Sequence, residues 1–211
     1  MPKIELPPTK SSLRRLKEDL SFAYEGYDLL NQKREILAIE IVKYIGEIRR
    51  VEAEFLDRLD ELYAAYRIAA VDMGSERVTL KSSSEKRSYF LHRESVRLMG
   101  LQLPKIRISS KGPRLAASLT GTTAAYDGAK KRSIKVLEVL VEYASITKSI
   151  TMLSRELKKV QRRVNALEKI FIPQHEEAKK YISDRLEEME RDEIFIKKLI
   201  RQRASGEKEI L

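Results

Sequence analysis

The stretch VLEVLVEYASITKSITMLSRELKKVQRRVNALEKIF, residues 136–171, decides the fold of this 211-residue chain. Alternating steps of three and four residues through it meet an apolar or aromatic side chain at every position. This heptad spacing turns one apolar stripe of a helix, here called the seam, toward a partner helix. The seam positions are Val136, Val139, Tyr143, Ile146, Ile150, Leu153, Leu157, Val160, Val164, Leu167 and Phe171.

A second seam lies nearer the start of the chain. The same stepping from Leu13 to Phe55 meets 13 positions, of which only Arg34 is neither apolar nor aromatic. A four-residue step then inserts a stutter. The apolar positions are Leu13, Leu16, Leu20, Ala23, Tyr27, Leu30, Leu37, Ile41, Tyr44, Ile48, Val51 and Phe55, extended by Leu59, Leu62, Tyr66, Ala69 and Met73.

The two seams predict two long helices. The first is expected over 11–73, because Pro7 and Pro8 cannot lie inside it and Thr9 or Ser11 can cap it. The second is expected over 129–204, with a kink at Pro173, which lacks an amide donor and crowds the preceding turn. Apolar spacing resumes beyond the proline at Ala178, Ile182, Leu186, Met189, Ile196 and Ile200.

Two seams of similar length in one chain suit an intramolecular pair. A chain that folds back on itself makes the pair antiparallel and brings both termini to the same end. The expected fold is therefore mainly α, a long antiparallel two-helix left-handed coiled coil in a single elongated domain over 1–211. The alternative is two independent helices that each pair with another copy of the chain.

The middle of the chain, residues 74–128, differs in composition. It contains most of the glycines, together with Pro104 and Pro113. Apolar and polar residues alternate here, as in Val78 and Leu80, which is typical of strands. We expect a short β-hairpin with residues 86–93 against 96–104 and a turn within His92–Ser95.

Composition restricts the classes of function. Lys and Arg exceed Asp and Glu by 42 to 32, which gives a net charge of +10 and allows an anionic partner. The chain has no cysteine, which excludes disulfides and thiol catalysis. No apolar run is long enough to span a bilayer, and the first ten residues lack a signal-peptide core. A soluble, cytoplasmic protein is expected.

Chemistry at a single site is not expected. His92 and His175 lack a second histidine at metal-ligand spacing, and residues 128–133 lack the first glycine of a phosphate-binding loop. No nucleophile, base and orienting group occur together in a recognisable pattern. The sequence therefore predicts no catalysis, no metal and no cofactor.

The strongest candidate for partner contact is a run of cations that lies opposite the second seam on a helical projection. We call it the basic face: Arg155, Lys158, Lys159, Arg162 and Arg163. Three interpretations remain open: a solvated helix surface, a contact with an acidic partner, and a nucleic-acid contact with salt-sensitive affinity. Flanking glutamates interrupt any long basic track. Asn165 and Arg34, beside and within the seams, are interpreted as polar groups that fix register.

The stretch Arg162-Arg163-Val164-Asn165-Ala166-Leu167-Glu168, followed by Ile172-Pro173, resembles the signature of the D subunits of the V/A-type rotary ATPases. Supporting likenesses occur in order along nearly the whole chain: Pro8-Thr9-Lys10-Ser11, Leu29-Leu30 with Lys33-Arg34, Leu103-Pro104 after Gly100, and Glu190-Arg191-Asp192-Glu193 with Phe195 and Lys197-Lys198. Within the signature, Asn165 and Glu168 join the basic face as candidate partner contacts.

The resemblance implies a central rotor stalk without catalytic groups of its own. Its partners would be the hexamer of A- and B-type subunits, a small F-type subunit that clasps the coil, and a funnel-shaped subunit over the membrane ring. Rotation would link ATP hydrolysis or synthesis to transport of protons or sodium ions. A coiled-coil scaffold and a basic nucleic-acid-associated protein are the alternatives.

Overall fold

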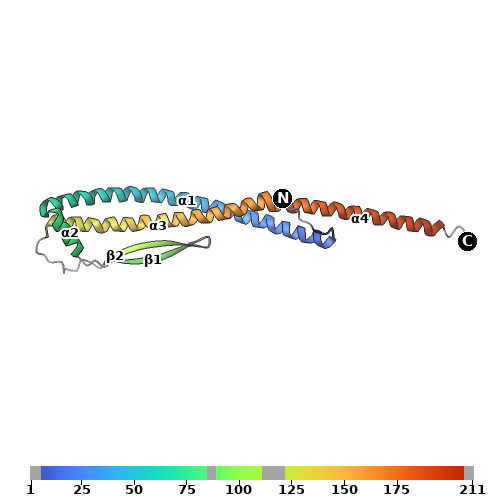
Figure 1. Cartoon of the computed structure of the whole chain (residues 1–211), viewed down its shortest axis with the longest axis horizontal. Coiled ribbons are helices and arrows are strands. Elements are labelled where there is room, and N and C mark those ends of the chain that lie inside the picture. Colours follow the sequence, from blue (N-terminus) through green and yellow to red (C-terminus); the bar gives the residue numbers. More distant parts are fainter. Residues whose placement is uncertain (1–5, 85–88, 111–121, 207–211) are drawn as a thin grey trace. The chain divides into compact units, whose positions relative to one another are not determined.

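Residues 6–84, 89–110 and 122–206 are described by a computed structural model (Figure 1). The elements are the helices α1 (Lys10–Met73) and α2 (Ser75–Ser84), the strands β1 (Tyr89–Leu98) and β2 (Leu101–Ser110), the helix α3 (Ala124–Ala166), the π-helical turn η1 (Leu167–Phe171) and the helix α4 (Ile172–Gly206). Long helices with a two-stranded antiparallel hairpin between them confirm the predicted fold class.

The chain divides into two compact units. The first unit combines residues 1–34 with 158–211, and the second contains residues 35–157. Each unit therefore contains part of α1 and part of the later helices. The two units are described separately below.

The start of α1 is capped by its own sequence. The amide of Ser12 donates to Oγ1 of Thr9 at 3.1 Å, and the amide of Leu13 donates to the Thr9 carbonyl at 3.0 Å. A threonine in this position satisfies amides that have no partner inside the helix. The helix begins at Lys10, directly after this cap, whereas the sequence predicted a start at residue 11.

In the first unit, α1 runs antiparallel to α4. Leu20, Ala23 and Ile172 form a buried cluster, against which Tyr27 and Leu167 pack. Beside this cluster, Tyr24 donates a hydrogen bond to Oε1 of Glu176 at 2.5 Å, and at the start of α1 Nζ of Lys10 lies 2.7 Å from Oε1 of Glu190. The earlier residue of α1, Lys10, thus contacts the later residue of α4, Glu190, so the two helices run antiparallel, as predicted.

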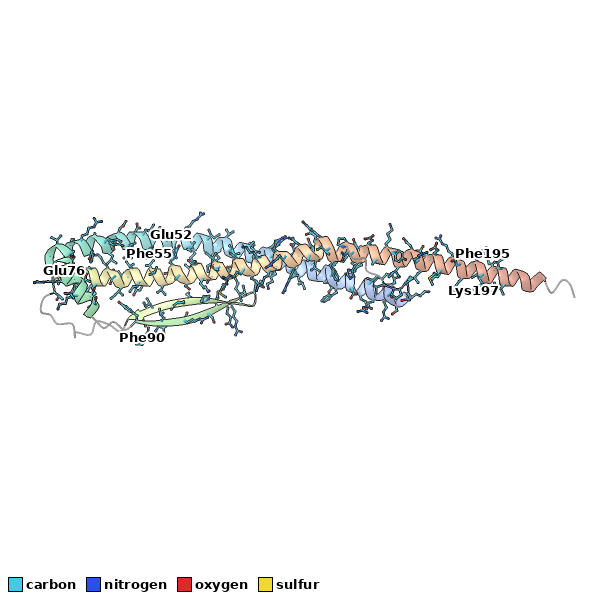
Figure 2. All side chains as sticks on the ribbon, in the orientation of Figure 1. Glu52, Phe55, Glu76, Phe90, Phe195 and Lys197 are labelled. Carbon is cyan, nitrogen blue, oxygen red and sulfur yellow. The ribbon has the colours of Figure 1, made fainter. Side chains whose placement is uncertain are left out.

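In the second unit, α1 and α3 bury the same kind of seam. Val51, Val139 and Ile146 form the buried cluster there. Phe55 stacks on Tyr143 with ring centroids 6.4 Å apart, and Figure 2 labels Phe55 on α1. Offset aromatic pairs at this spacing add to the stabilisation from buried area.

The predicted seam residues differ in how far they are buried. Fully buried are Leu16, Leu20, Leu37, Val51, Val136, Val139, Ile146, Leu153, Val160 and Val164. Half-buried are Leu13, Tyr27, Leu30, Ile41, Ile48, Phe55, Tyr143, Ile150, Leu157 and Leu167. Beyond the stutter, Ala65 and Ala69 are buried and Tyr66 is exposed, so the assignment of Tyr66 to the seam was wrong.

Phe171 was also wrongly assigned to the seam. The π-helical turn Leu167–Phe171 closes with a hydrogen bond from the Ile172 amide to the Leu167 carbonyl, five residues back. This wider turn holds one extra residue. The seam therefore passes from Leu167 to Ile172, which is 8% exposed, while Phe171 is 38% exposed and stacks on His175. Pro173, which has no amide hydrogen, follows directly.

The segment around Val78 is helical, which corrects its interpretation as strand-like. Gly74 takes a positive φ of 83° and ends α1, and α2 begins at Ser75. Val78 is buried in a cluster with Ala69 and Tyr126, so α2 packs against α1 and α3. One buried residue with exposed neighbours at Thr79 and Leu80 is compatible with a helix as well as with a strand.

The hairpin is longer than predicted and its turn lies elsewhere. Tyr89 pairs with Ser110 and Leu98 with Leu101, so the turn consists of Met99 and Gly100 rather than His92–Ser95. Both turn residues have positive φ, 47° and 81°. Positive φ at both positions is the requirement of the two-residue type I′ turn. Glycine meets it freely, whereas methionine adopts it rarely, so Met-Gly gives a weak sequence signal.

Candidate partner-binding site

The basic face lies on the exposed side of α3. Lys158, Lys159, Arg162 and Arg163 belong to the first unit and all are exposed. Val160, which lies between them, and Val164, which follows them, are buried. The seam fixes the rotation of the helix, and the cations therefore point away from the pair. Arg155 is exposed as well, and it belongs to the second unit.

Most of these cations are available for an acidic partner. Nε of Arg162 donates to the Lys158 carbonyl at 3.3 Å, which holds the guanidinium along its own helix. Among the residues that the structure describes, Lys158, Arg162 and Arg163 form no salt bridge with a carboxylate. Long exposed cations of this kind give weak contacts, each about 0–1 kcal/mol with a solvated partner.

Asn165 and Glu168 are exposed beside the basic face. Oδ1 of Asn165 accepts a hydrogen bond from Nε2 of Gln161 at 2.9 Å, one turn back on the same helix. The bond is local, so Asn165 does not fix the register between the helices, contrary to the expectation from the sequence. Glu168 lies on the π-helical turn, at the point where the seam shifts by one residue.

The end of α4 is a surface that sequence reasoning missed. Lys10 at the start of α1 meets Glu190, yet α4 continues to Gly206. No side chain of α1 lies opposite this end among the described residues, so its apolar side chains are exposed. They are Ile194, Phe195, Ile196, Leu199 and Ile200, which we call the α4 tip; Figure 2 labels Phe195 and Lys197 there.

The α4 tip corrects the expectation that the seam continues through Met189, Ile196 and Ile200. All three are more than half exposed. Apolar spacing alone does not reveal this. In an antiparallel pair that starts at residue 10, the position opposite Lys10 limits how far the second helix can be covered. The contact between Lys10 and Glu190 gives that limit.

The polar contacts near the α4 tip hold α1 and α4 together. The hydrogen bond from Lys10 lowers the pKa of Glu190 and raises the pKa of Lys10. The hydrogen bond to Glu176 raises the pKa of Tyr24. All of these groups are exposed, and each shift follows from a contact between α1 and α4 rather than from a pocket that could hold a substrate.

The described residues contain no cluster of three side chains that could hold a metal ion. No helix among them is long and apolar enough to cross a membrane. What the fold presents instead is a two-helix coil with a cationic surface on one unit and an apolar helix end. These features define a class of protein that acts through surfaces for partner proteins.

Comparison with known proteins identifies the family. The family model for the D subunits of ATP synthases matches residues 12–202. The V-type ATP synthase D subunit of Thermotoga neapolitana is 34% identical, over 96% of this chain and 100% of that protein. The A-type ATP synthase D subunit of Pyrococcus abyssi is 32% identical over 92% and 93%, and a second V-type D subunit, that of Treponema pallidum, is 32% identical over 95% and 96%.

The chain therefore belongs to the family of ATP synthase D subunits, the central-stalk subunits of the V/A-type ATP synthases. Its role is that of a structural subunit in a multi-subunit complex that links ATP to ion transport, and not that of a catalytic subunit. The resemblance found in the sequence is confirmed. The alternatives, a scaffold without a rotary role and a nucleic-acid-associated coil, are not supported.

Proposed function

We propose that this subunit is the rotor axle that carries torque between a hexamer of A- and B-type subunits and an ion-translocating membrane ring. The observation that carries the proposal is the α4 tip, where Phe195 is 63% and Ile200 is 61% exposed at the end of a helix. Exposed apolar side chains in such a cluster mark a surface that another protein covers. The central cavity of the hexamer is the surface we assign to it.

The described pairing suits an axle. In each unit the helices are held by a buried seam, while their outer surfaces carry charged side chains. Contacts made by exposed charges are individually weak and readily exchanged. Such a surface can turn inside a collar without being held at one angle, whereas a seam buried along the pair resists separation of the helices.

The basic face is the proposed contact for the small F-type stalk subunit. Its cations favour an acidic surface on that partner, and Asn165 and Glu168 add polar contacts beside it. The second unit is the proposed contact for the funnel-shaped subunit over the membrane ring. We place the chain in the cytoplasm, peripheral to the membrane, without direct binding of nucleic acid. The single elongated domain over 1–211 remains a prediction that small-angle scattering would test.

Reversing the charge of the basic face should weaken assembly and leave the fold intact. In the variant Arg155→Glu, Lys159→Glu, Arg162→Glu, we expect unchanged helicity, because these positions lie opposite the seam. Affinity for the purified F-type subunit should fall by roughly tenfold or more, since each reversal replaces an attraction by a repulsion. Circular dichroism and titration calorimetry at two salt concentrations measure the two effects.

In a matched control, cations outside the basic face are replaced by glutamate. Lys179 and Lys180 are exposed on α4, outside the basic face, and their reversal should change the affinity for the F-type subunit much less. Equal losses in both variants would mean that net charge alone drives the contact. Loss of helicity in the basic-face variant would mean that these residues do not lie opposite the seam.

A further inference from the structure

The two edges of the β-hairpin differ in how they are protected. The outer edge of β2 faces α3 within the second unit (Figure 1). There Oγ of Ser145 donates to the Pro104 carbonyl at 2.7 Å and accepts from the Ile106 amide at 3.3 Å. Pro104 has no amide to leave unpaired. At Pro104 and Ile106 the edge of β2 is thus covered by Ser145 and by the proline itself, and Leu103 beside them is 2% exposed.

The register shows which groups of β1 point outward. Pro104 and Ile106 direct their backbone groups away from β1, so their partners Ser95 and Arg93 direct theirs away from β2. The same holds at every second residue, and hence for Leu91 and Arg97. Among the described residues the sheet has two strands only, and no hydrogen bond reaches these outward groups.

β1 has neither a bulge nor a proline along this open edge. Every residue from Tyr89 to Leu98 pairs one to one with β2, so the strand has no bulge, and it contains no proline. Soluble proteins guard an exposed edge by bulges, prolines or charged side chains, because a straight edge with free amides and carbonyls accepts another strand. Of these guards β1 has only charges, among them Arg93 and Arg97. Within the same hairpin and among the described residues, the outer edge of β2 is covered by α3, whereas the outer edge of β1 is not.

We propose that the outer edge of β1 binds an extended, acidic segment of another protein by strand addition. Main-chain hydrogen bonds along the outward groups of Leu91, Arg93, Ser95 and Arg97 would provide the affinity. The edge belongs to the hairpin, and neither the α4 tip nor the basic face contributes a residue to it. The proposal is therefore independent of whether the coil acts as an axle.

The charges of the hairpin select an acidic occupant. Arg107 pairs with Glu94 at 3.8 Å across the strands. Among the described residues, Arg93 and Arg97 have no carboxylate partner, and both lie on one face of β1 because they are four residues apart. An added strand with a carboxylate at every second residue would place one beside each arginine, and opposite charges at such positions are favourable.

A second copy of this chain fits the edge less well. Two β1 strands paired antiparallel about Ser95 would set Arg93 of each copy opposite Arg97 of the other. Like charges directly opposite one another destabilise a strand pair. Leu91, which is 64% exposed, is the apolar contact available to either occupant, so the charges decide between them.

The decisive variant is Ser95→Pro in the full chain. Proline there removes one outward amide and leaves the ladder to β2 intact, just as Pro104 does directly opposite. The control Ser95→Ala keeps the amide. The probe is a fluorescein-labelled peptide with the sequence Thr-Val-Glu-Val-Glu-Val-Thr, blocked at both ends, and its binding is measured by fluorescence anisotropy. Proline should weaken binding by about tenfold or more relative to alanine.

A second arm alters the probe and leaves the chain unchanged. Methylation of the peptide amides along one edge should weaken binding by a similar factor, since strand addition needs those donors. A probe in which lysines replace the glutamates should not bind the wild type. It should bind the double variant Arg93→Glu, Arg97→Glu. Amide exchange of Phe90 and Val96 reports whether the hairpin ladder survives in each variant.

Each other outcome overturns the proposal. Equal affinity of the proline and alanine variants, or of the methylated and plain probes, would show that side-chain charge alone binds the peptide. No binding of the acidic probe by the wild type at millimolar concentration would leave the edge without this function. Self-association in sedimentation that Ser95→Pro removes would assign the edge to a second copy of the chain.

Discussion

Leu153→Ala is expected to lower the free energy of unfolding by about 2–5 kcal/mol, the range for deleting a buried leucine side chain. Leu153 is fully buried on α3 in the second unit. Alanine would leave a cavity between the paired helices, because a helix backbone can relax only partly into the space. Urea unfolding followed by circular dichroism measures the difference, provided that the slope of the transition is unchanged.

Ile39→Ala provides the matched control in the same unit. Ile39 is 67% exposed on α1, so its loss should change stability by about 0.5 kcal/mol or less. Leu157→Ala should fall between the two, because Leu157 is half-buried. If Leu153→Ala were no more costly than Ile39→Ala, the seam on α3 would not be the contact that holds the helix pair together.

The seam was readable from the sequence because its cause is local. A stripe at heptad spacing has to be buried, and Leu16, Leu37 and Val164 are buried for that reason. Phe171 was not predictable in the same way. A π-helical turn shifts the register by one residue, and Leu167–Phe171 contains no residue that requires such a turn. Only the packing of Ile172 against Leu20 and Ala23 reveals it.

The middle of the chain was predicted in kind and not in detail. Alternation indicated a hairpin, but its register depends on the turn, and Met99-Gly100 is a weaker signal than asparagine or aspartate before glycine. Val78 was assigned to a strand-like region because a short segment with one buried residue fits either periodicity. Its contact with Tyr126, far along the chain, is what selects the helix.

The basic face could be placed on the outside of α3 from the sequence alone, since the seam fixes the rotation of the helix. The α4 tip could not be recognised from periodicity, because the apolar spacing of Ile196 and Ile200 looks like that of a buried seam. Whether such residues are covered depends on where the opposite helix begins. The hydrogen-bonded pair of Lys10 and Glu190 supplies that information.

Truncating the chain after Glu190 should abolish ATP-driven rotation in a complex reconstituted with A- and B-type subunits. The truncation removes the exposed apolar residues of the α4 tip and leaves the contact between Lys10 and Glu190 in place. Apolar anchors at the centre of an interface carry most of its binding energy. The truncated coil should therefore no longer bind in the central cavity of the hexamer, although the rest of the helix pair remains folded.

Rotation can be observed through a single introduced thiol. The chain has no cysteine, and Glu76 is exposed on α2 in the second unit, so Glu76→Cys gives one attachment point for a bead (Figure 2). With the intact tip, ATP should turn the bead in steps. The pair Phe195→Ser, Ile200→Ser should reduce the fraction of rotating beads by roughly tenfold, as expected for loss of buried anchors.

Substitutions on the polar side of the same helix end provide the control, because they distinguish loss of a specific apolar contact from a general disturbance of the helix. Lys197→Ala, Lys198→Ala removes two exposed cations between Phe195 and Ile200, and it should leave most beads rotating because exposed charges contribute little. If this variant stops rotation as completely as Phe195→Ser, Ile200→Ser, the apolar side chains of the α4 tip are not the contact that holds the coil in the hexamer. If beads on the intact chain stay still while the bound hexamer hydrolyses ATP, the coil does not turn, and the axle proposal is wrong.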